Sequence, residues 1–142
     1  MFACLFFGDS LALGTGMAVN ALLPRACEIR AAEGASSMAM MRWTPSPRRY
    51  GTTILSVGSN DDIGPATPPR LRLRAVERIT NLRSHPPSHR YIWLLPYDRS
   101  RAALVRRIAA TFGDEILDLA RFPSRDGIHP ASYRTVAGAL LR

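Results

Sequence analysis

Hydrophobic residues along this chain gather in five short runs, and most of these runs end in glycine, proline or small polar residues. Short apolar runs bounded by turn residues are typical of buried strands. The strands predicted in this way cover residues 1–7, 26–32, 52–57, 91–95 and 115–119. The run over residues 26–32 has the least regular pattern of the five.

Between these runs, apolar residues recur at the three- and four-residue spacing of helices that pack one face on a core. A helical segment is predicted within residues 11–23, interrupted by Gly14 and Gly16. A short helix is predicted to open within residues 34–37 and to continue to residue 43.

Three later helices are predicted from capping residues as well as from spacing. One has an N-cap and a first-turn proline at residues 67–68, a second is capped by Asp98 or Ser100 and ended by Gly113, and the last starts at residues 129–130. The first of these helices is predicted to turn Leu71, Val76, Ile79 and Leu82 toward the core, and Arg70, Arg74 and Arg78 outward.

Strands and helices alternate along the chain, as they do where helices cover both faces of a parallel sheet. A chain of 142 residues is the size of one domain with one core. The sequence therefore predicts an α/β protein: a three-layer α/β/α flavodoxin-like fold with a mainly parallel five-stranded sheet in the order 2-1-3-4-5.

The net charge of +8 comes entirely from arginine, because the chain contains no lysine. A basic surface can meet nucleic acid, an anionic polysaccharide or a membrane surface. The arginines are scattered and are not interleaved with aromatic residues, so no specific nucleic-acid partner is expected. No apolar stretch approaches the roughly 20 residues of a membrane-spanning helix, so no membrane span is expected.

The two cysteines, Cys4 and Cys27, each lie in a predicted buried strand. Without a Cys-x-x-Cys motif or a His/Cys cluster, they are expected to be reduced core thiols, although neighbouring strands would allow a disulfide. Reduced thiols slightly favour the cytoplasm. The apolar N-terminus lacks a basic segment, so no signal peptide is expected.

Three polar loops follow predicted strands, namely residues 8–11, 58–62 and 126–130. The carboxyl ends of parallel strands meet at one edge of a sheet, where ligands bind. Ser10, Asn60 and His129 are therefore predicted to converge, although they are far apart in the sequence.

The residue types in these loops are those that nucleophilic catalysis requires. Ser10 is a nucleophile once a base such as His129 takes its proton. Asp126, three residues before His129, can hold the other ring nitrogen protonated. The backbone N–H groups of Ser10 and Gly34 and the amide of Asn60 can donate to an oxyanion.

These motifs resemble those of the SGNH, or GDSL, hydrolase family. The resemblance is carried, in the family's order, by Gly-Asp-Ser-Leu at residues 8–11, Gly34 within Gly-Ala-Ser-Ser, Gly-Ser-Asn-Asp at residues 58–61 and Asp-Gly-Ile-His-Pro at residues 126–130. It implies a single SGNH hydrolase domain over residues 1–142.

The same resemblance implies the hydrolysis of esters through an acyl-serine intermediate. It implies Ser10 as nucleophile, His129 as base and Asp126 as the acid that orients it, with Ser10, Gly34 and Asn60 as oxyanion donors. No metal and no organic cofactor are expected.

Further acidic and aromatic residues are expected near this edge of the sheet. Asp9 is expected to support the turn around Ser10, and Asp9, Tyr97 and Asp98 are candidate substrate-binding residues. The adjacent Asp61 and Asp62 resemble half of a metal site, but without a third ligand a loop-capping role is favoured.

The chain is short for the family, so its site is expected to be open and shallow. A buried acyl chain needs a deep apolar pocket. The favoured function is therefore removal of acetyl or other short acyl groups from a carbohydrate or a small ester. Two alternatives remain: a lysophospholipase or thioesterase acting on longer acyl chains, and a non-catalytic arginine-rich module that binds an anionic polymer. The oligomeric state stays open.

Overall fold

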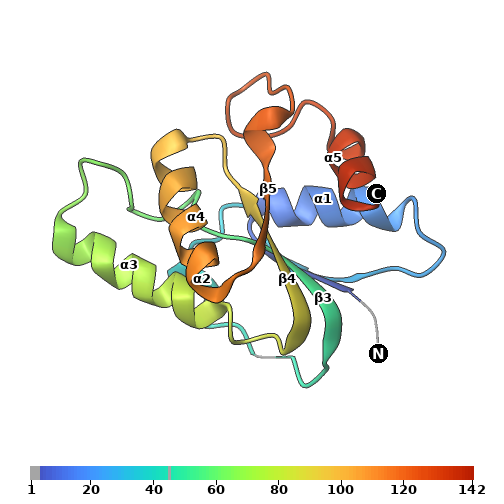
Figure 1. The fold of residues 1–142 in the computed structure, drawn as a ribbon, viewed down its shortest axis with the longest axis horizontal. Coiled ribbons are helices and arrows are strands. Elements are labelled where there is room, and N and C mark those ends of the chain that lie inside the picture. The colour runs from blue at the N-terminus through green and yellow to red at the C-terminus, as the bar shows by residue number, and fades with distance from the viewer. Residues whose placement is uncertain (1–3, 45) are drawn as a thin grey trace.

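The computed structural model of the protein describes residues 4–44 and 46–142, and its strands form one parallel sheet (Figure 1). The strands are β1 (Cys4–Gly8), β2 (Glu28–Ala31), β3 (Tyr50–Ser56), β4 (Ser88–Leu95) and β5 (Glu115–Asp118). Their order is β2-β1-β3-β4-β5. The predicted fold class and strand order are therefore confirmed, and the described strands are all parallel. The start of the first predicted strand, residues 1–3, lies outside the described residues.

Helices cover both faces of this sheet, as Figure 1 shows. They are α1 (Ser10–Asn20), α2 (Ser37–Met40), α3 (Pro69–Leu82), α4 (Arg99–Phe112) and α5 (Tyr133–Leu140), with a 3-10 turn at Leu119–Arg121. The apolar residues of α1 and α5 share one core cluster, and those of α2, α3 and α4 share the other. Among the residues described, no helix combines the length and the apolar character that crossing a membrane requires.

The central strands β1, β3 and β4 were recognisable in the sequence because their residues are buried on both faces. In β1, Leu5 and Phe7 pack toward α3 and α4, whereas Phe6 packs toward α1 and α5. A strand buried on both faces is apolar at successive positions. Trp93 of β4 is completely buried, and its indole N–H donates to the carboxylate of Asp114 at 2.9 Å.

Helix α1 runs without a break through Gly14 and Gly16, so the predicted interruption is wrong. The glycines are needed for packing instead. A Cβ atom on Gly14 would lie 2.4 Å from the Tyr133 ring, and one on Gly16 would lie 2.9 Å from Phe6. Both glycines thus let α1 lie close to its neighbours in the core.

Two other helix starts differ from the prediction. Helix α3 begins at Pro69, one residue later than expected, and Pro68 takes the N-cap position. Helix α5 begins at Tyr133 with the Ser132 hydroxyl as its cap, so His129 lies in the preceding loop and not at a helix start. The predicted end of α4 is confirmed, because Gly113 adopts a φ of 69° there.

The expectation of two reduced cysteines is wrong, because Cys4 and Cys27 form a disulfide. Their strands are neighbours, with Leu5 opposite Glu28. One residue earlier in this register, Cys4 faces Cys27 at a Cα–Cα distance of 4.8 Å. The preference for the cytoplasm, which depended on reduced thiols, loses its support.

Candidate active site

The first candidate residue, Ser10, stands at the turn from β1 into α1. Gly8 makes this turn with a φ of +148°, and a Cβ atom there would lie only 1.8 Å from the Ser56 carbonyl oxygen of β3. The Asp9 N–H donates to that same carbonyl at 3.1 Å. A residue with a side chain could not replace Gly8 without separating β1 from β3 at the point where Ser10 leaves the sheet.

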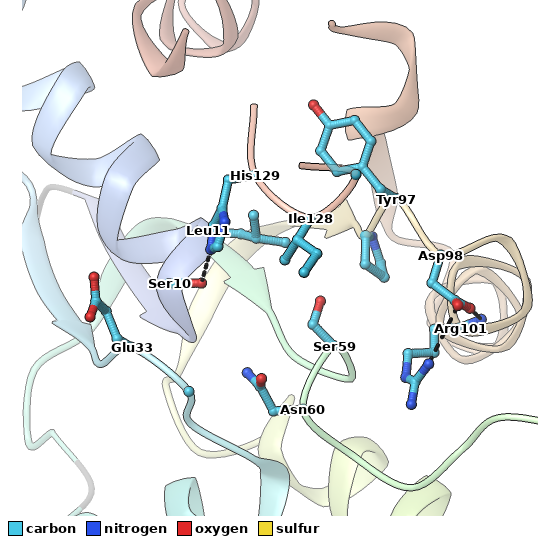
Figure 2. A pocket seen from close by; sticks show the side chains of 13 residues that line it. Ser10, Leu11, Glu33, Ser59, Asn60, Tyr97, Asp98, Arg101, Ile128 and His129 are labelled. Carbon is cyan, nitrogen blue, oxygen red and sulfur yellow. Dashed lines mark hydrogen bonds and ion pairs between the residues drawn. The ribbon is translucent and has the colours of Figure 1, made fainter. Parts of the chain in front are cut away.

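Ser10, His129 and Asp126 form a chain of hydrogen-bonded groups across this edge of the sheet. The Ser10 Oγ lies 3.2 Å from His129 Nε2, which Figure 2 marks with a dashed line. His129 Nδ1 lies 2.8 Å from Asp126 Oδ2. Since a carboxylate only accepts, Nδ1 carries the proton in a neutral ring, and Nε2 is then free to accept from the serine.

Asp126 is held in the ionised form by its hydrogen bonds. Its pKa lies well below the ordinary value because it accepts from the His129 backbone N–H, from the His129 ring and from the Ile128 N–H. The two backbone bonds measure 2.7 and 2.8 Å and both reach Oδ1. Oδ2 is therefore left for the histidine ring.

The loop that carries Asp126 and His129 is closed by Ser124. The Ser124 hydroxyl donates to the His129 carbonyl at 2.6 Å and accepts from the Gly127 N–H at 2.9 Å. Gly127 adopts a φ of +73°, which favours glycine. The loop thus fixes the histidine through bonds within six residues.

The three expected oxyanion donors lie around one cavity. Ser10, Gly34 and Asn60 line the same cavity of about 630 Å³. In the part of the chain that the structure describes, the N–H groups of Ser10 and Gly34 have no acceptor. Asn60 donates one amide hydrogen to the Ala35 carbonyl at 3.1 Å, and its second amide hydrogen has no acceptor among the described residues. In the view of Figure 2, Asn60 lies on the opposite side of the Ser10 hydroxyl from His129.

Two of the three candidate substrate-binding residues, Tyr97 and Asp98, line this cavity. Asp9 does not, because it is fully buried, and this expectation is corrected. Its Oδ1 accepts from the Leu11 N–H at 3.1 Å and from the Ser56 hydroxyl at 2.7 Å. Burial raises the pKa of Asp9 to about 6. Asp9 supports the turn around Ser10, as also expected.

The cavity has further polar residues that the sequence did not single out, namely Glu33, Ser59 and Arg101. Arg101, three residues after the N-cap Asp98 of α4, forms an ion pair with the Asp98 carboxylate at 3.4 Å. That three-residue spacing at a helix start was a usable signal. The contact of Tyr133 with Ser10 had no such signal: the Tyr133 hydroxyl donates to the Ser10 carbonyl at 3.4 Å.

Asp61, for which a loop-capping role was favoured, binds the start of α2. Its buried carboxylate accepts from the Ser37 N–H at 3.0 Å and from the Ser37 hydroxyl at 2.6 Å. It thereby joins the loop that carries Asn60 to the start of α2. Over residues 4–44 and 46–142, no three His, Cys, Asp or Glu side chains come together as a metal site.

Two solved structures from Streptococcus pneumoniae share this fold. One is a protein provisionally described as a platelet activating factor, 16% identical with a TM-score of 0.63, and the match covers 97% of this chain and 81% of that one. The other is the C-terminal catalytic domain of peptidoglycan O-acetyltransferase A with a methylsulfonyl adduct, 16% identical with a TM-score of 0.56, covering 98% and 90%. At this identity the similarity establishes the fold alone. No family model and no curated protein matches the sequence.

Proposed function

We propose that this protein is a serine ester hydrolase that works through an acyl-serine at Ser10. The observation that carries the proposal is the hydrogen-bonded series from the Ser10 Oγ through the His129 ring to Asp126, with distances of 3.2 and 2.8 Å. These are the spacings that a nucleophile, its base and the group that orients the base require.

In the first half-reaction, the Ser10 Oγ attacks the ester carbonyl carbon while its proton passes to His129 Nε2. The carbon–alkoxide bond then breaks, and the departing alkoxide takes the proton from Nε2. Asp126 remains ionised throughout and stabilises the histidinium that forms between the two steps. Its lowered pKa suits that role.

In the second half-reaction, water takes the place of the alcohol. His129 accepts a proton from the water, whose oxygen attacks the acyl carbon, and then returns the proton to the Ser10 Oγ as the acid leaves. In both steps the carbonyl oxygen becomes an oxyanion that accepts from the N–H groups of Ser10 and Gly34 and from Asn60. One such donor is worth roughly 3 kcal/mol in a transition state.

The substrate class that fits this cavity is a short acyl ester, most simply an acetyl ester, on a carbohydrate or another small alcohol. The walls of the cavity include the apolar residues Leu11, Pro96 and Ile128. They also carry polar groups that can bind hydroxyl groups of a carbohydrate, from Glu33, Tyr97, Asp98 and Arg101. The peptidoglycan O-acetyltransferase domain with the same fold supports acetyl groups on a saccharide. An acetyl transfer at Ser10 would differ from the proposed hydrolysis in the second step, where a sugar hydroxyl would replace water.

The test compares p-nitrophenyl acetate with p-nitrophenyl octanoate for the wild type, Ser10→Ala and Ser84→Ala. Ser84 is an exposed serine beyond the end of α3 and serves as the matched control. We expect the acetate to be preferred and Ser10→Ala to lose at least about 1,000-fold in kcat/KM. Ser84→Ala should match the wild type.

Each other outcome selects an alternative. Preference for octanoate would replace the proposal by a lysophospholipase or thioesterase. Equal activity of wild type and Ser10→Ala would leave the non-catalytic module that binds an anionic polymer. Release of acetate only when a carbohydrate acceptor is absent, with acetylation of the acceptor when it is present, would indicate transfer in place of hydrolysis.

A further inference from the structure

A second groove adjoins the catalytic cavity at Asn60. It has a volume of about 290 Å³ and lies between α2, α3 and the loop over residues 60–62. Asn60 lines this groove and the catalytic cavity alike. Residues that line the groove besides Asn60 are Ser36, Met38, Asp61, Asp62, Leu71, Arg74 and Arg78. The two cavities therefore adjoin at Asn60.

The helix beside this groove carries arginines at a four-residue spacing, Arg70, Arg74 and Arg78, which places them along one helix face. None of them forms an ion pair with a described residue, whereas Arg83 and Arg99 each pair with an aspartate. Like charges at this spacing repel each other. An anionic ligand would remove that repulsion.

The loop between the two cavities is fixed by an arginine on each side. Arg101, in the catalytic cavity, donates to the Asp61 carbonyl at 3.3 and 3.4 Å. Arg78, in the groove, donates to the Ser37 hydroxyl at 3.0 Å, and that hydroxyl donates to the Asp61 carboxylate. These hydrogen bonds fix the loop that separates the two cavities, and an arginine lies on each side of it.

The remaining groove residues suit a saccharide chain. Met38 and Leu71 are 51% and 46% exposed, although Leu71 was predicted to face the core. Such apolar side chains can pack on the C–H faces of sugar rings. The Asp62 carboxylate can accept from hydroxyl groups, and the exposed Arg74 can pair with a carboxylate.

We infer that this groove is a subsite for the chain of an acidic, carboxylate-bearing saccharide. The ester of the substrate lies at Ser10, the chain passes Asn60, and a carboxylate on a nearby sugar pairs with Arg74. The inference deepens the proposed function and rests on it for the position of the ester.

The test uses O-acetylated polygalacturonate as the acidic polymer, O-acetylated mannan as the neutral one and p-nitrophenyl acetate as a substrate for the catalytic cavity alone. The variants are Arg74→Glu and Arg107→Glu. Arg107 is an exposed α4 arginine that lines neither cavity and has no ion pair with a described residue. Both variants change the net charge equally.

For the wild type we expect kcat/KM to be at least fivefold higher on the acidic polymer than on the neutral one, with a preference that declines as salt is added. Arg74→Glu should lower the ratio of acidic-polymer to p-nitrophenyl acetate activity at least tenfold, and Arg107→Glu should leave it within twofold. Equal ratios for the two variants, or a preference of the wild type for the neutral polymer, would overturn the inference.

Binding of unesterified polygalacturonate to the Ser10→Ala protein tests the groove without catalysis. We expect binding that Arg74→Glu, added to the same protein, weakens at least tenfold. If this binding is found and the wild-type protein has no esterase activity, the groove is retained and the proposed function is rejected. Esterase activity without binding and without acidic preference would reject the groove alone.

Discussion

Two aspartates beside the site, Asp9 and Asp126, accept similar hydrogen bonds, but their pKa values are shifted in opposite directions. Each accepts from a backbone N–H two residues later, Asp9 from Leu11 and Asp126 from Ile128. Each also accepts from side chains, Asp9 from the Ser56 hydroxyl and Asp126 from the His129 ring and, at 3.2 Å, from the Ser124 hydroxyl. Yet the pKa of Asp9 is raised to about 6, whereas that of Asp126 lies far below its ordinary value.

Exposure to water explains the difference. Asp9 is completely buried, and its Oδ2 has no hydrogen-bond partner among the described residues, so desolvation outweighs its hydrogen bonds. Asp126 is exposed and loses little hydration, so its bonds act almost unopposed. The local hydrogen bonds alone therefore do not determine the pKa of an aspartate, because burial also contributes. The turn of Asp9 has a structural role, and the loop of Asp126 presents a permanent anion to His129.

The largest expected effect separates these roles by activity. Asp126→Asn should lower kcat for p-nitrophenyl acetate by about 10³- to 10⁴-fold, because the amide can donate to Nδ1 and so favour the tautomer with its proton on Nε2. Glu77→Gln, which neutralises an exposed carboxylate of α3 that lines neither cavity, is the control. Loss of less than tenfold in Asp126→Asn would contradict the assignment.

The next effect concerns stability and pH at Asp9. The pKa of Asp9 is about 6 in the folded protein and 3.8, the ordinary value, in the unfolded chain. Between these two pH values the folded protein therefore binds more protons than the unfolded chain. The free energy of unfolding therefore falls by about 3 kcal/mol as the pH rises through this window and then stays level, as far as this one group is concerned.

Asp9→Asn removes that loss. The difference in unfolding free energy between Asp9→Asn and the wild type should therefore rise from pH 4 to pH 6.5, as urea unfolding would measure. Taking the difference cancels the titration of other acids, such as Asp118, whose pKa is lowered by Arg99. Parallel curves for the two proteins would show that Asp9 is not the buried titrating group.

The smallest expected effect concerns the hydrogen bond between Ser56 and Asp9. Ser56→Ala removes the 2.7 Å hydrogen bond to Asp9 and should destabilise the fold by about 1–2 kcal/mol at pH 7. A bond to a charged acceptor is stronger than one to a neutral acceptor. The same substitution in the Asp9→Asn background should therefore cost less, and a double-mutant cycle measures the difference. Additive costs would mean that the serine does not stabilise the charge.

Much of the site could be predicted because each of its main loops follows an apolar strand. Ser10 and Asn60 come just after β1 and β3, and a parallel sheet brings both to one edge. The catalytic roles themselves remain predictions that await the experiments above. The signals that failed were those with two interpretations: Gly14 resembled a helix break and is a packing contact with Tyr133.

Other features could not be predicted because they depend on pairs brought together by the fold. Cys4 and Cys27 became partners only through the register of β1 with β2. Tyr133 reaches the Ser10 carbonyl across the packing of α5 on α1. Glu33 lines the cavity from a segment that carries no distinctive motif.

What the sequence determined by itself is local. The apolar runs specify the strands, and Asp126 caps its own loop and orients His129 within three residues, so no distant partner is needed. The sequence also predicts that Ser10 meets the histidine 119 residues away, because both loops lie at one edge of a parallel sheet. Only the tertiary structure decided that Asp9 loses its water while Asp126 keeps it. Local hydrogen bonds depend on a few neighbouring residues, whereas burial depends on every atom that packs around a group.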